Sequence, residues 1–481
     1  MHRKILVAIA IFSSAASFGA VRAVTPTAWD GDPNCWQMKR HNATMDIVTN
    51  GGAKVVFIGD SITHGWESAG KEQLKKYFGE GDFKMLNLGT GGDRTEHVLW
   101  RLTKGKELDG YEAKVVFVQI GTNNTGHFPR AEEPPVDTII GIRKILRVVA
   151  EKQPRAKIVL TAIFPRGADI TDACRRRNAV VNREIAKFAD GKTIFWLDFN
   201  CQFLTADGRL PRELFPDLLH PAARGYEIWA SAALPYAQAA LAGTPLPPSR
   251  WASFVYAEDV GMSEPPALVP DSRCNTYWWL YRMFVKRSEI LASDGRFDVV
   301  LFGDSITHYW EDAGKESLAA LRKTYSVLDI GYSGDRTEQL LWRGENGELD
   351  GYRAKCIMLM IGTNNTWHRK DRPEDIAAGI RRILDLIARK QPDATTLLLP
   401  IFPFGDRADH PNRLNNEKVN ATIRGYADGR KVRWLDFNAR FVDEKGDNVK
   451  WMPDHCHPNA AAYREIWLPA ILPALKEIVG R

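Results

Sequence analysis

The sequence predicts an α/β fold arranged as two tandem domains, each built on a five-stranded parallel sheet. Two observations predict it. A long internal repeat divides the 481 residues into two similar parts, and in each part short apolar runs alternate with longer helical patterns. The apolar runs are continuous rather than alternating, which is typical of strands buried on both faces of a parallel sheet. We therefore expect two flavodoxin-like three-layer α/β/α domains.

The internal repeat is nearly identical over several segments. The matched pairs, first copy then second, are GDSITHGWE (59–67) with GDSITHYWE (303–311), GGDRTE (91–96) with SGDRTE (333–338), IGTNNT (120–125) with IGTNNT (361–366), and WLDFN (196–200) with WLDFN (434–438). A repeat of roughly 240 residues indicates a duplicated domain rather than a solenoid unit.

Each copy has five apolar runs in matching places, and we expect these to be the strands. They cover residues 54–59, 83–89, 114–121, 157–164 and 193–199 in the first copy, and 297–303, 325–331, 356–362, 395–402 and 432–437 in the second. Right-handed crossovers place the carboxyl ends of such strands on one edge of the sheet. Open α/β sheets carry their functional sites at that edge.

The ends of the two domains follow from composition. Arg3 and Lys4 precede an apolar stretch that ends at Ala23, which predicts a secretory signal peptide over residues 1–23 and a secreted or periplasmic protein. An uncleaved N-terminal anchor is the alternative. No later run reaches the ~18 apolar residues of a spanning helix, so no membrane span is expected after signal cleavage. Pro, Ser and Gly mark a linker at 246–272 between domains at 24–245 and 273–481.

The composition excludes some partners. Hydrophobic residues make up 44% of the chain, charged residues 26%, and the formal charge is +6. These values are typical of a soluble globular protein, and without a basic cluster interleaved with aromatics no nucleic-acid partner is predicted. The six cysteines show no CxxC pair and no metal-ligand spacing. One or two disulfides are possible in an oxidising compartment.

Polar residues follow the predicted strands in both copies. They are Ser61, Gly92, Asn123, Asp217 and His220 in the first copy, and Ser305, Gly334, Asn364, Asp454 and His457 in the second. A hydroxyl, a glycine amide, a carboxamide, an imidazole and a carboxylate at one sheet edge are the groups needed for acyl transfer through a serine.

Each group has a chemical reason to be there. A serine hydroxyl is a weak nucleophile, and a histidine is suited to take its proton. A carboxylate three residues before that histidine can bond its other ring nitrogen and fix the tautomer. The serine and glycine N–H groups and the asparagine amide are the expected donors to the oxyanion of the tetrahedral intermediate.

These motifs resemble those of the SGNH (GDSL-type) hydrolases, and most of all the platelet-activating-factor acetylhydrolase catalytic-subunit-like esterases. NLGTGGDRTEHVLWR (87–101), QIGTNN (119–124) and IFPRG (163–167) carry the resemblance, which extends over nearly all of both halves. It implies no cofactor and no metal. It implies the serines as nucleophiles, the Asp-x-x-His pairs as acid and base, and oxyanion holes made by Ser61, Gly92 and Asn123 and by Ser305, Gly334 and Asn364.

The resemblance also implies that bulky side chains close the acyl pocket. The candidates are Ile62 and Leu219 in the first copy and Ile306 and Cys456 in the second. We therefore expect both halves to prefer acetyl or similarly short acyl groups, with the second slightly roomier.

Other polar residues near these motifs have structural interpretations. Loop bracing is expected for Asp60, Asp93, Arg94, Asp304, Asp335 and Arg336, and a position near the cleft for His64, His127, His308 and His368. His455 is an alternative base, but its spacing to Asp454 does not fit the motif.

The sequence favours a secreted tandem serine esterase that removes acetyl groups from carbohydrate or other small esters. Three alternatives stay open: a lysophospholipase or phospholipid acetylhydrolase, one catalytic half paired with one substrate-binding half, and acyl transfer to a sugar hydroxyl instead of water. The expected partner is a small-molecule or glycan ester.

Overall fold

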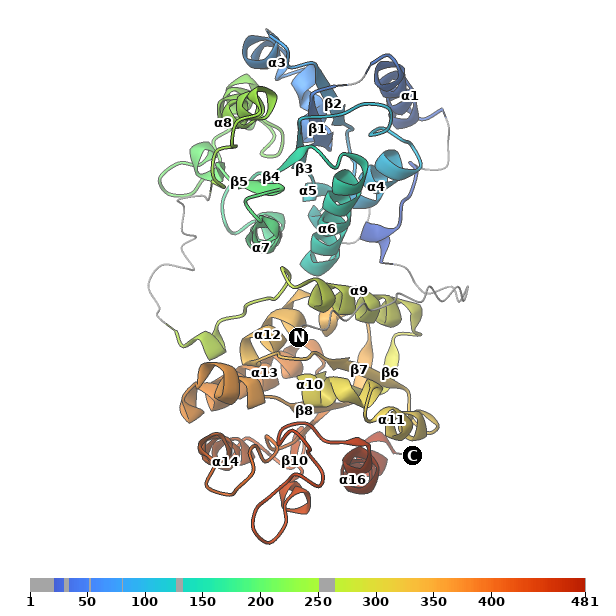
Figure 1. Cartoon of the computed structure of the whole chain (residues 1–481), viewed down its shortest axis with the longest axis vertical. Helices are drawn as coiled ribbons and strands as arrows, with labels where there is room; N and C mark the ends of the chain where they lie inside the picture. Colours follow the sequence, from blue (N-terminus) through green and yellow to red (C-terminus); the bar gives the residue numbers. More distant parts are fainter. Residues whose placement is uncertain are drawn as a thin grey trace, which may run out of the picture.

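The computed structural model describes residues 21–29, 34–51, 53–79, 81–126, 133–250 and 264–480. Within these ranges the chain forms two α/β domains, drawn one above the other in Figure 1. Most of the predicted signal peptide, residues 1–20, lies outside the described residues, as do the central part of the predicted linker and His127.

Each domain is built on a parallel sheet of five strands, which confirms the predicted fold class. In spatial order the first sheet is β2 (Met85–Gly89), β1 (Val55–Gly59), β3 (Val115–Gln119), β4 (Lys157–Thr161) and β5 (Ile194–Leu197). The second repeats this order with β7 (Val327–Gly331), β6 (Arg296–Gly303), β8 (Arg353–Met360), β9 (Thr395–Leu398) and β10 (Val432–Trp434). The strand order reverses beside β1 and β6, and such switch points open a crevice at the carboxyl ends of the strands.

Helices connect the strands. In the first domain they are α1 (Trp36–Thr49), α2 (Ser61–His64), α3 (Lys71–Phe78), α4 (Thr95–Thr103), α5 (Thr122–Gly126), α6 (Pro135–Lys152), α7 (Ala173–Ile185) and α8 (Ala223–Ala242). In the second they are α9 (Tyr277–Ala292), α10 (Ser305–His308), α11 (Lys315–Arg322), α12 (Thr337–Arg343), α13 (Pro373–Lys390), α14 (Pro411–Arg424), α15 (Ala460–Ala462) and α16 (Leu468–Val479).

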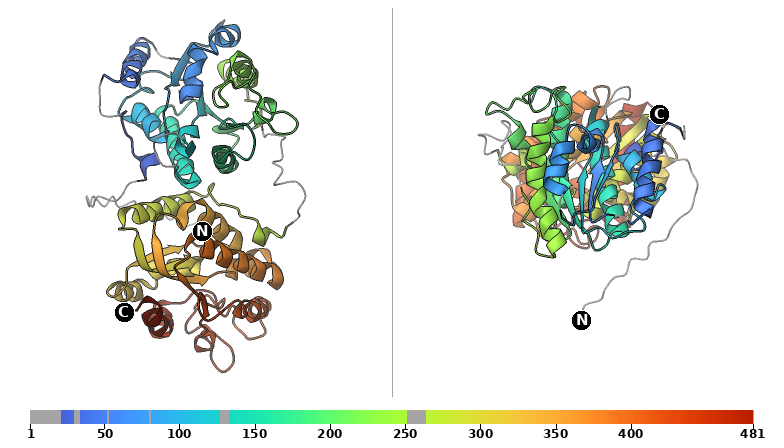
Figure 2. Two further views of the ribbon diagram at one scale, coloured as in Figure 1. Left: turned by 180° about the vertical axis from the view of Figure 1, so that it is seen from behind. Right: turned by 90° about the horizontal axis from the view of Figure 1, so that it is seen from above.

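Both faces of each sheet are buried, as the continuous apolar runs predict. In β1, Val56 and Ile58 pack into one apolar cluster with residues of α4, α6 and α7, whereas Val55 and Phe57 pack into another with residues of α3 and α8. The alternation of side chains along a strand explains this division. Figure 2 shows the strands of the first domain between helices on both sides.

The two domains pack through the same helical layer. One apolar cluster runs without interruption from Ile139 and Ile142 of α6 to Trp279 and Met283 of α9, and these two helices lie next to each other in Figure 1. At this interface Arg287 Nε and Nη2 donate to the Asp137 carboxylate, each over 3.2 Å, and both side chains are buried. The halves therefore share part of their hydrophobic core.

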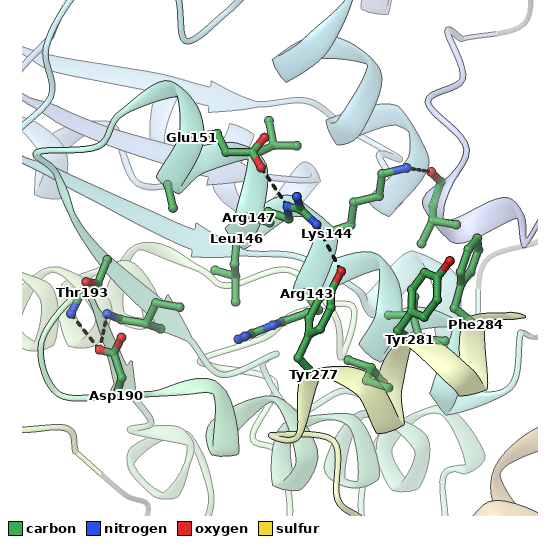
Figure 3. A pocket seen from close by; sticks show the side chains of 16 residues that line it. Arg143, Lys144, Leu146, Arg147, Glu151, Asp190, Thr193, Tyr277, Tyr281 and Phe284 are labelled. Atoms are coloured by element: carbon green, nitrogen blue, oxygen red, sulfur yellow. Dashed lines mark hydrogen bonds and ion pairs between the residues drawn. The ribbon is translucent and has the colours of Figure 1, made fainter. Parts of the chain in front are cut away.

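A cavity of about 830 Å³ lies in the groove between α6, the start of β5 and α9 (Figure 3). Tyr277, Tyr281 and Phe284 of α9 face Arg143 and Arg147 of α6 across it, and Arg147 Nη1 donates to Tyr277 Oη over 3.4 Å. None of the site residues predicted from the sequence lines this cavity.

Short turns before each domain belong to the repeated unit. Thr95 Oγ1 donates to the buried carbonyl of Ala23 over 2.8 Å, and Thr337 Oγ1 donates to Ala267 O over the same distance. At the other end of the first domain, Arg250 N donates to Trp196 O beside β5 over 2.8 Å. Residues 21–23, 246–250 and 264–272 therefore pack with the domains.

All six cysteines lie within the described residues, and each carries a free thiol. In the ranges that the structure describes, no helix combines the length and apolar character needed to span a bilayer. The same ranges hold no cluster of three or more His, Cys, Asp or Glu side chains arranged to bind a metal ion.

Candidate active sites

The first candidate nucleophile stands at the point where β1 turns into α2. Gly59 ends the strand, and a β-carbon there would lie 2.0 Å from Thr63 Oγ1 and 2.3 Å from Gln119 O, so only glycine fits. Asp60 caps the helix, because its Oδ1 accepts from Ile62 N over 2.9 Å. Ser61 is consequently the first residue of α2, with its side chain at the sheet edge.

The structure brings the predicted serine, histidine and aspartate of the first copy into one hydrogen-bonded chain. Ser61 Oγ lies 2.8 Å from His220 Nε2, and His220 Nδ1 lies 2.6 Å from Asp217 Oδ2. Ser61 thus meets two residues that lie 156 and 159 positions further along the chain. The three have the geometry of a serine nucleophile, its base and the group that orients the base.

The second copy reproduces this chain. Ser305 Oγ lies 2.9 Å from His457 Nε2, and His457 Nδ1 lies 2.6 Å from Asp454 Oδ2. Asp304 caps α10 through Ile306 N over 3.0 Å, as Asp60 caps α2. Both candidate sites are therefore complete in the same arrangement.

The loop that carries the aspartate and histidine holds itself in place. Asp217 Oδ1 accepts from the backbone N–H of Leu219 over 2.9 Å and of His220 over 2.7 Å. Leu218 takes a left-handed conformation with φ of 61°, and His455 takes the same one in the second copy with φ of 60°. Desolvation raises the pKa of Asp217, but hydrogen bonds from the His220 ring and the backbone outweigh it and leave the pKa below its ordinary value.

The predicted oxyanion loops follow β2 and β7. Gly92 and Gly334 both have φ of 78°, a left-handed conformation that favours glycine. Asn123 Nδ2 donates one proton to Asp93 O over 2.8 Å, and Asn364 Nδ2 donates to Asp335 O over 2.9 Å. This bond fixes the orientation of each amide and leaves its second proton for another acceptor.

A buried aspartate in each of these loops holds the loop in place through hydrogen bonds. Asp93 accepts from Trp29 Nε1 over 2.6 Å and from Arg101 Nε over 2.8 Å. Burial raises the pKa of Asp93 to about 6, although Arg101 acts to lower it. In the second copy Asp335 accepts from Trp279 Nε1 over 2.7 Å and from Arg343 Nε over 2.9 Å, and its pKa is raised to about 6 by burial.

The two helix-capping aspartates are also buried. Burial raises the pKa of Asp60 to about 7 and that of Asp304 to about 7. In each, Oδ1 receives the capping bond while Oδ2 has no partner among the described residues. A protonated carboxyl group suits such a position better than a carboxylate.

The acyl-pocket candidates lie in different surroundings. Ile62 and Ile306 are each 1% exposed and pack into the apolar cores. Leu219 is partly buried beside His220, whereas Cys456 is 4% exposed.

No other histidine in the described ranges is hydrogen-bonded to Ser61 or Ser305. His64 stacks on Trp36 with ring centroids 5.8 Å apart. His308 Nδ1 lies 2.9 Å from Ser333 Oγ, and burial lowers its pKa to about 4. His455 Nδ1 lies 2.9 Å from Asn448 Oδ1, which leaves His457 as the histidine bonded to Ser305.

Sequence reasoning missed several supporting residues. Tyr226 Oη donates to Ile62 O over 2.7 Å, and Tyr463 Oη donates to Ile306 O over 2.5 Å, which ties each nucleophile helix to the last part of its domain. Arg101 and Arg343 support the oxyanion loops from inside. The signal for the two arginines was present, because each occupies the same place in the repeated LWR segment.

A family model and several known proteins match this chain. A sequence model of the GDSL-like lipase/acylhydrolase family matches residues 57–228 and 301–465, which together cover more than half of the chain. The protein belongs to this family, and the family carries out ester hydrolysis. The chain is therefore an enzyme of the carboxylic ester hydrolase class, with two copies of the family domain.

Individual relatives each match a length close to one domain. The platelet-activating factor acetylhydrolase IB subunit alpha1 of Homo sapiens is 37% identical over 192 residues, which is 40% of this chain and 78% of the relative. The alpha2 subunit of Rattus norvegicus is 34% identical over 193 residues, covering 39% of this chain and 78% of the relative.

Two solved structures are also similar to parts of this chain. A GDSL-like lipase from Bacteroides thetaiotaomicron has a TM-score of 0.35 at 18% identity and covers 42% of this chain and 98% of its own. The acetylxylan esterase Axe2 from Geobacillus stearothermophilus has a TM-score of 0.30 at 18% identity, covering 39% of this chain and 95% of its own.

Proposed function

We propose that both halves are active serine esterases that release short acyl groups, acetyl above all, from carbohydrate or other small esters. One observation carries the proposal: each half holds an unbroken chain from serine to histidine to aspartate, at 2.8 and 2.6 Å in the first half and 2.9 and 2.6 Å in the second. A binding module has no need of this arrangement. Two complete chains therefore favour two catalytic halves over one catalytic and one binding half.

The first half reaction forms an acyl-enzyme. Ser61 Oγ attacks the ester carbonyl carbon while His220 Nε2 takes its proton, and Asp217 holds the resulting imidazolium in place. The oxyanion accepts hydrogen bonds from the N–H groups of Ser61 and Gly92 and from the free proton of Asn123 Nδ2. The carbon–oxygen bond to the alcohol then breaks, and the imidazolium returns its proton to the leaving alcohol oxygen.

The second half reaction uses the same groups with water. His220 Nε2 takes a proton from water, whose oxygen attacks the acyl carbon, and the tetrahedral intermediate again faces the three donors. Collapse breaks the bond to Ser61 Oγ, which regains its proton from the imidazolium, and the carboxylic acid leaves. Ser305, His457 and Asp454 perform the same steps in the second half.

Two kinds of substrate fit these groups. The predicted signal peptide favours an exported enzyme and hence a glycan ester outside the cytoplasm. The identity of at least 34% to platelet-activating factor acetylhydrolase subunits favours an acetyl group, and it also supports an acetylated phospholipid as a second candidate.

Separate serine variants test the two-enzyme proposal. Ser61→Ala and Ser305→Ala should each retain the activity of the other half on nitrophenyl acetate, and the two residual rates should add up to that of the wild type. The double variant should lose turnover, whereas Ser231→Ala, on the exposed side of α8, serves as a control. Complete loss in either single variant would contradict two independent sites.

The substrate and the location need their own measurements. Nitrophenyl esters from two to eight acyl carbons should show peak activity at two, and a peak at eight would contradict the short-acyl proposal. Acetate release from acetylated xylan and pectin, compared with release from an acetylated phospholipid, separates the two substrate classes. N-terminal sequencing of exported protein tests the signal peptide and shows whether cleavage retains the buried residues Val21 and Ala23.

A further inference from the structure

The residue that covers the oxyanion-loop glycine differs between the two candidate sites. A β-carbon on Gly92 would lie 3.0 Å from Cη2 of the Trp29 ring, whereas one on Gly334 would lie 2.8 Å from Nη1 of Arg273. The first loop therefore has a neutral indole against it, and the second has a guanidinium. The sequence motifs of the two copies do not reveal this difference.

Only one nitrogen of the Arg273 guanidinium, Nη1, has acceptors among the described residues. Its Nη1 donates to Ser333 O over 2.8 Å and lies 3.5 Å from Asp335 Oδ1, and its charge lies 5.2 Å from the centre of the Trp278 ring. Nε and Nη2 have no acceptor among the described residues, and 28% of the side chain is exposed. A guanidinium has five N–H donors, so several remain for a ligand.

Among the described residues, the ion-pair partner of Arg273 is Asp335, which Arg273 shares with other donors. Asp335 is buried and already accepts from Trp279 and Arg343. Two further arginines, Arg336 and Arg369, are both paired with Glu338.

The other titratable groups of the second site form no ion pair with Arg273 among the described residues. Burial, then Arg336 and Arg273, lower the pKa of His368 and disfavour its charged form. Burial raises the pKa of Asp304, and Asp454 is engaged by His457. Arg273 thus keeps N–H donors that no described residue accepts.

We propose that the second site takes esters whose alcohol part carries a carboxylate, and that Arg273 binds this carboxylate next to the oxyanion loop. The inference rests on the proposed esterase activity and refines its substrate class for one half. Arginine is suited to this task because its planar fork matches a carboxylate in two parallel hydrogen bonds. The hydrolysis follows the same two half reactions as for a neutral ester. Water adds to the acyl carbon, and the products are acetate and the alcohol that carries the carboxylate.

The first site does not share this feature. One arginine of the first site, Arg166, lies beside the loop after β3, where Nη1 donates to the carbonyl oxygens of Thr122 and Gly126 over 3.2 and 3.0 Å. Arg273 and Arg166 thus lie beside different strand ends, the first after β7 and the second after β3. We expect a substrate whose carboxylate reaches Arg273 to be handled by the second half alone.

Matched substrates test the proposal on the full-length protein. In the Ser61→Ala variant only the second site can turn over, and 4-acetoxybenzoate is compared with its neutral analogue 4-acetoxybenzamide by acetate release. We expect KM for the benzoate to be roughly tenfold lower than for the benzamide, in line with a charge-assisted hydrogen-bonded pair. In the Ser305→Ala variant the two KM values should be similar.

Variants of Arg273 complete the test. With Ser61→Ala, Arg273→Gln should bring the ratio of the two KM values close to one, and Arg273→Lys should retain part of it. Arg353→Gln, which removes an exposed charge at the opposite end of β8, should leave the ratio as it is. Equal KM values in Ser61→Ala, or a ratio that survives Arg273→Gln, would overturn the anion site while leaving the esterase intact. If Ser61→Ala released acetate from neither substrate, the proposed activity of the second half would itself be wrong.

Discussion

The ring of Tyr309 lies across the face of His457, with ring centroids 4.9 Å apart and planes tilted by 30°. The same place in the first copy is Gly65, which has no side chain. As a result 20% of the His457 side chain is exposed, compared with 42% of His220. The single difference within the repeated GDSITH(G/Y)WE segment therefore decides how openly the catalytic histidine faces solvent.

Removing the Tyr309 ring should widen the alcohol side of the second site. In the Ser61→Ala background we expect Tyr309→Gly to raise kcat/KM for 2-naphthyl acetate relative to ethyl acetate, because the leaving alcohol departs beside His457. Tyr309→Phe keeps the ring and should leave the ratio close to that of the parent. A lower ratio in Tyr309→Gly would indicate that the tyrosine binds the alcohol rather than restricting it.

Adjacent asparagines should have different roles. Asn123→Ala removes a proposed oxyanion donor, so we expect kcat of the first site to fall by about 10²–10³. Asn124 instead holds α4, because its Oδ1 accepts from Thr95 N over 3.1 Å and its Nδ2 donates to Glu133 over 2.9 Å.

Asn124→Ala should consequently lower stability by about 1–3 kcal/mol while costing less in kcat than Asn123→Ala. Nitrophenyl acetate kinetics in the Ser305→Ala background and urea unfolding separate the two effects. If Asn123→Ala were less stable but had an unchanged kcat, the assignment of Asn123 as an oxyanion donor would be wrong.

The buried aspartate before each serine should make stability depend on pH. Burial raises the pKa of Asp60 from 3.8 to about 7, so between these values the folded state holds a proton that the unfolded state releases. The contribution of Asp60 to the free energy of unfolding should therefore fall as pH rises from about 4 to about 7, by up to about 4 kcal/mol.

Asp60→Asn should flatten this dependence and make the protein more stable than the wild type at pH 8, since the amide resembles the protonated carboxyl. Urea midpoints at pH 5 and pH 8 measure the effect, with Asp46→Asn on the exposed side of α1 as a control. If the urea midpoint changed equally between pH 5 and pH 8 in the wild type and in Asp60→Asn, the pKa of Asp60 would not be raised.

The ion pair between the domains should control how tightly they pack. Arg287→Met leaves Asp137 buried without its partner, and breaking a buried pair in this way typically costs about 3–5 kcal/mol. For Arg287→Met we expect a larger radius of gyration by small-angle X-ray scattering than for the wild type, and unfolding at a lower urea concentration.

The double variant Asp137→Leu with Arg287→Met should recover much of this loss, because replacing a whole buried pair by apolar residues is often neutral. Removing the exposed pair of Arg381 and Asp385 on α13 should have little effect. A double variant that is less stable than Arg287→Met alone would contradict this account.

Much of the fold was predictable because it depends on local pattern. Continuous apolar runs identify strands buried on both faces, and the repeat supplies each strand twice. The boundaries were harder to predict. The turn at Ala23 looks like part of a leader, yet its carbonyl accepts a hydrogen bond from Thr95, 72 positions along the chain. No composition rule reports such a contact.

The sequence by itself determined the parallel α/β fold, the duplication, and the residue types of the two sites, because strand ends, glycine turns and the Asp-x-x-His spacing are local features. Only the tertiary structure decided which side chains meet across the chain. It placed Arg273 against Gly334 and Trp29 against Gly92, laid Tyr309 over His457, and joined the two halves through α6 and α9. These contacts join residues with no fixed spacing, so they follow from the packing of whole helices and sheets rather than from any motif.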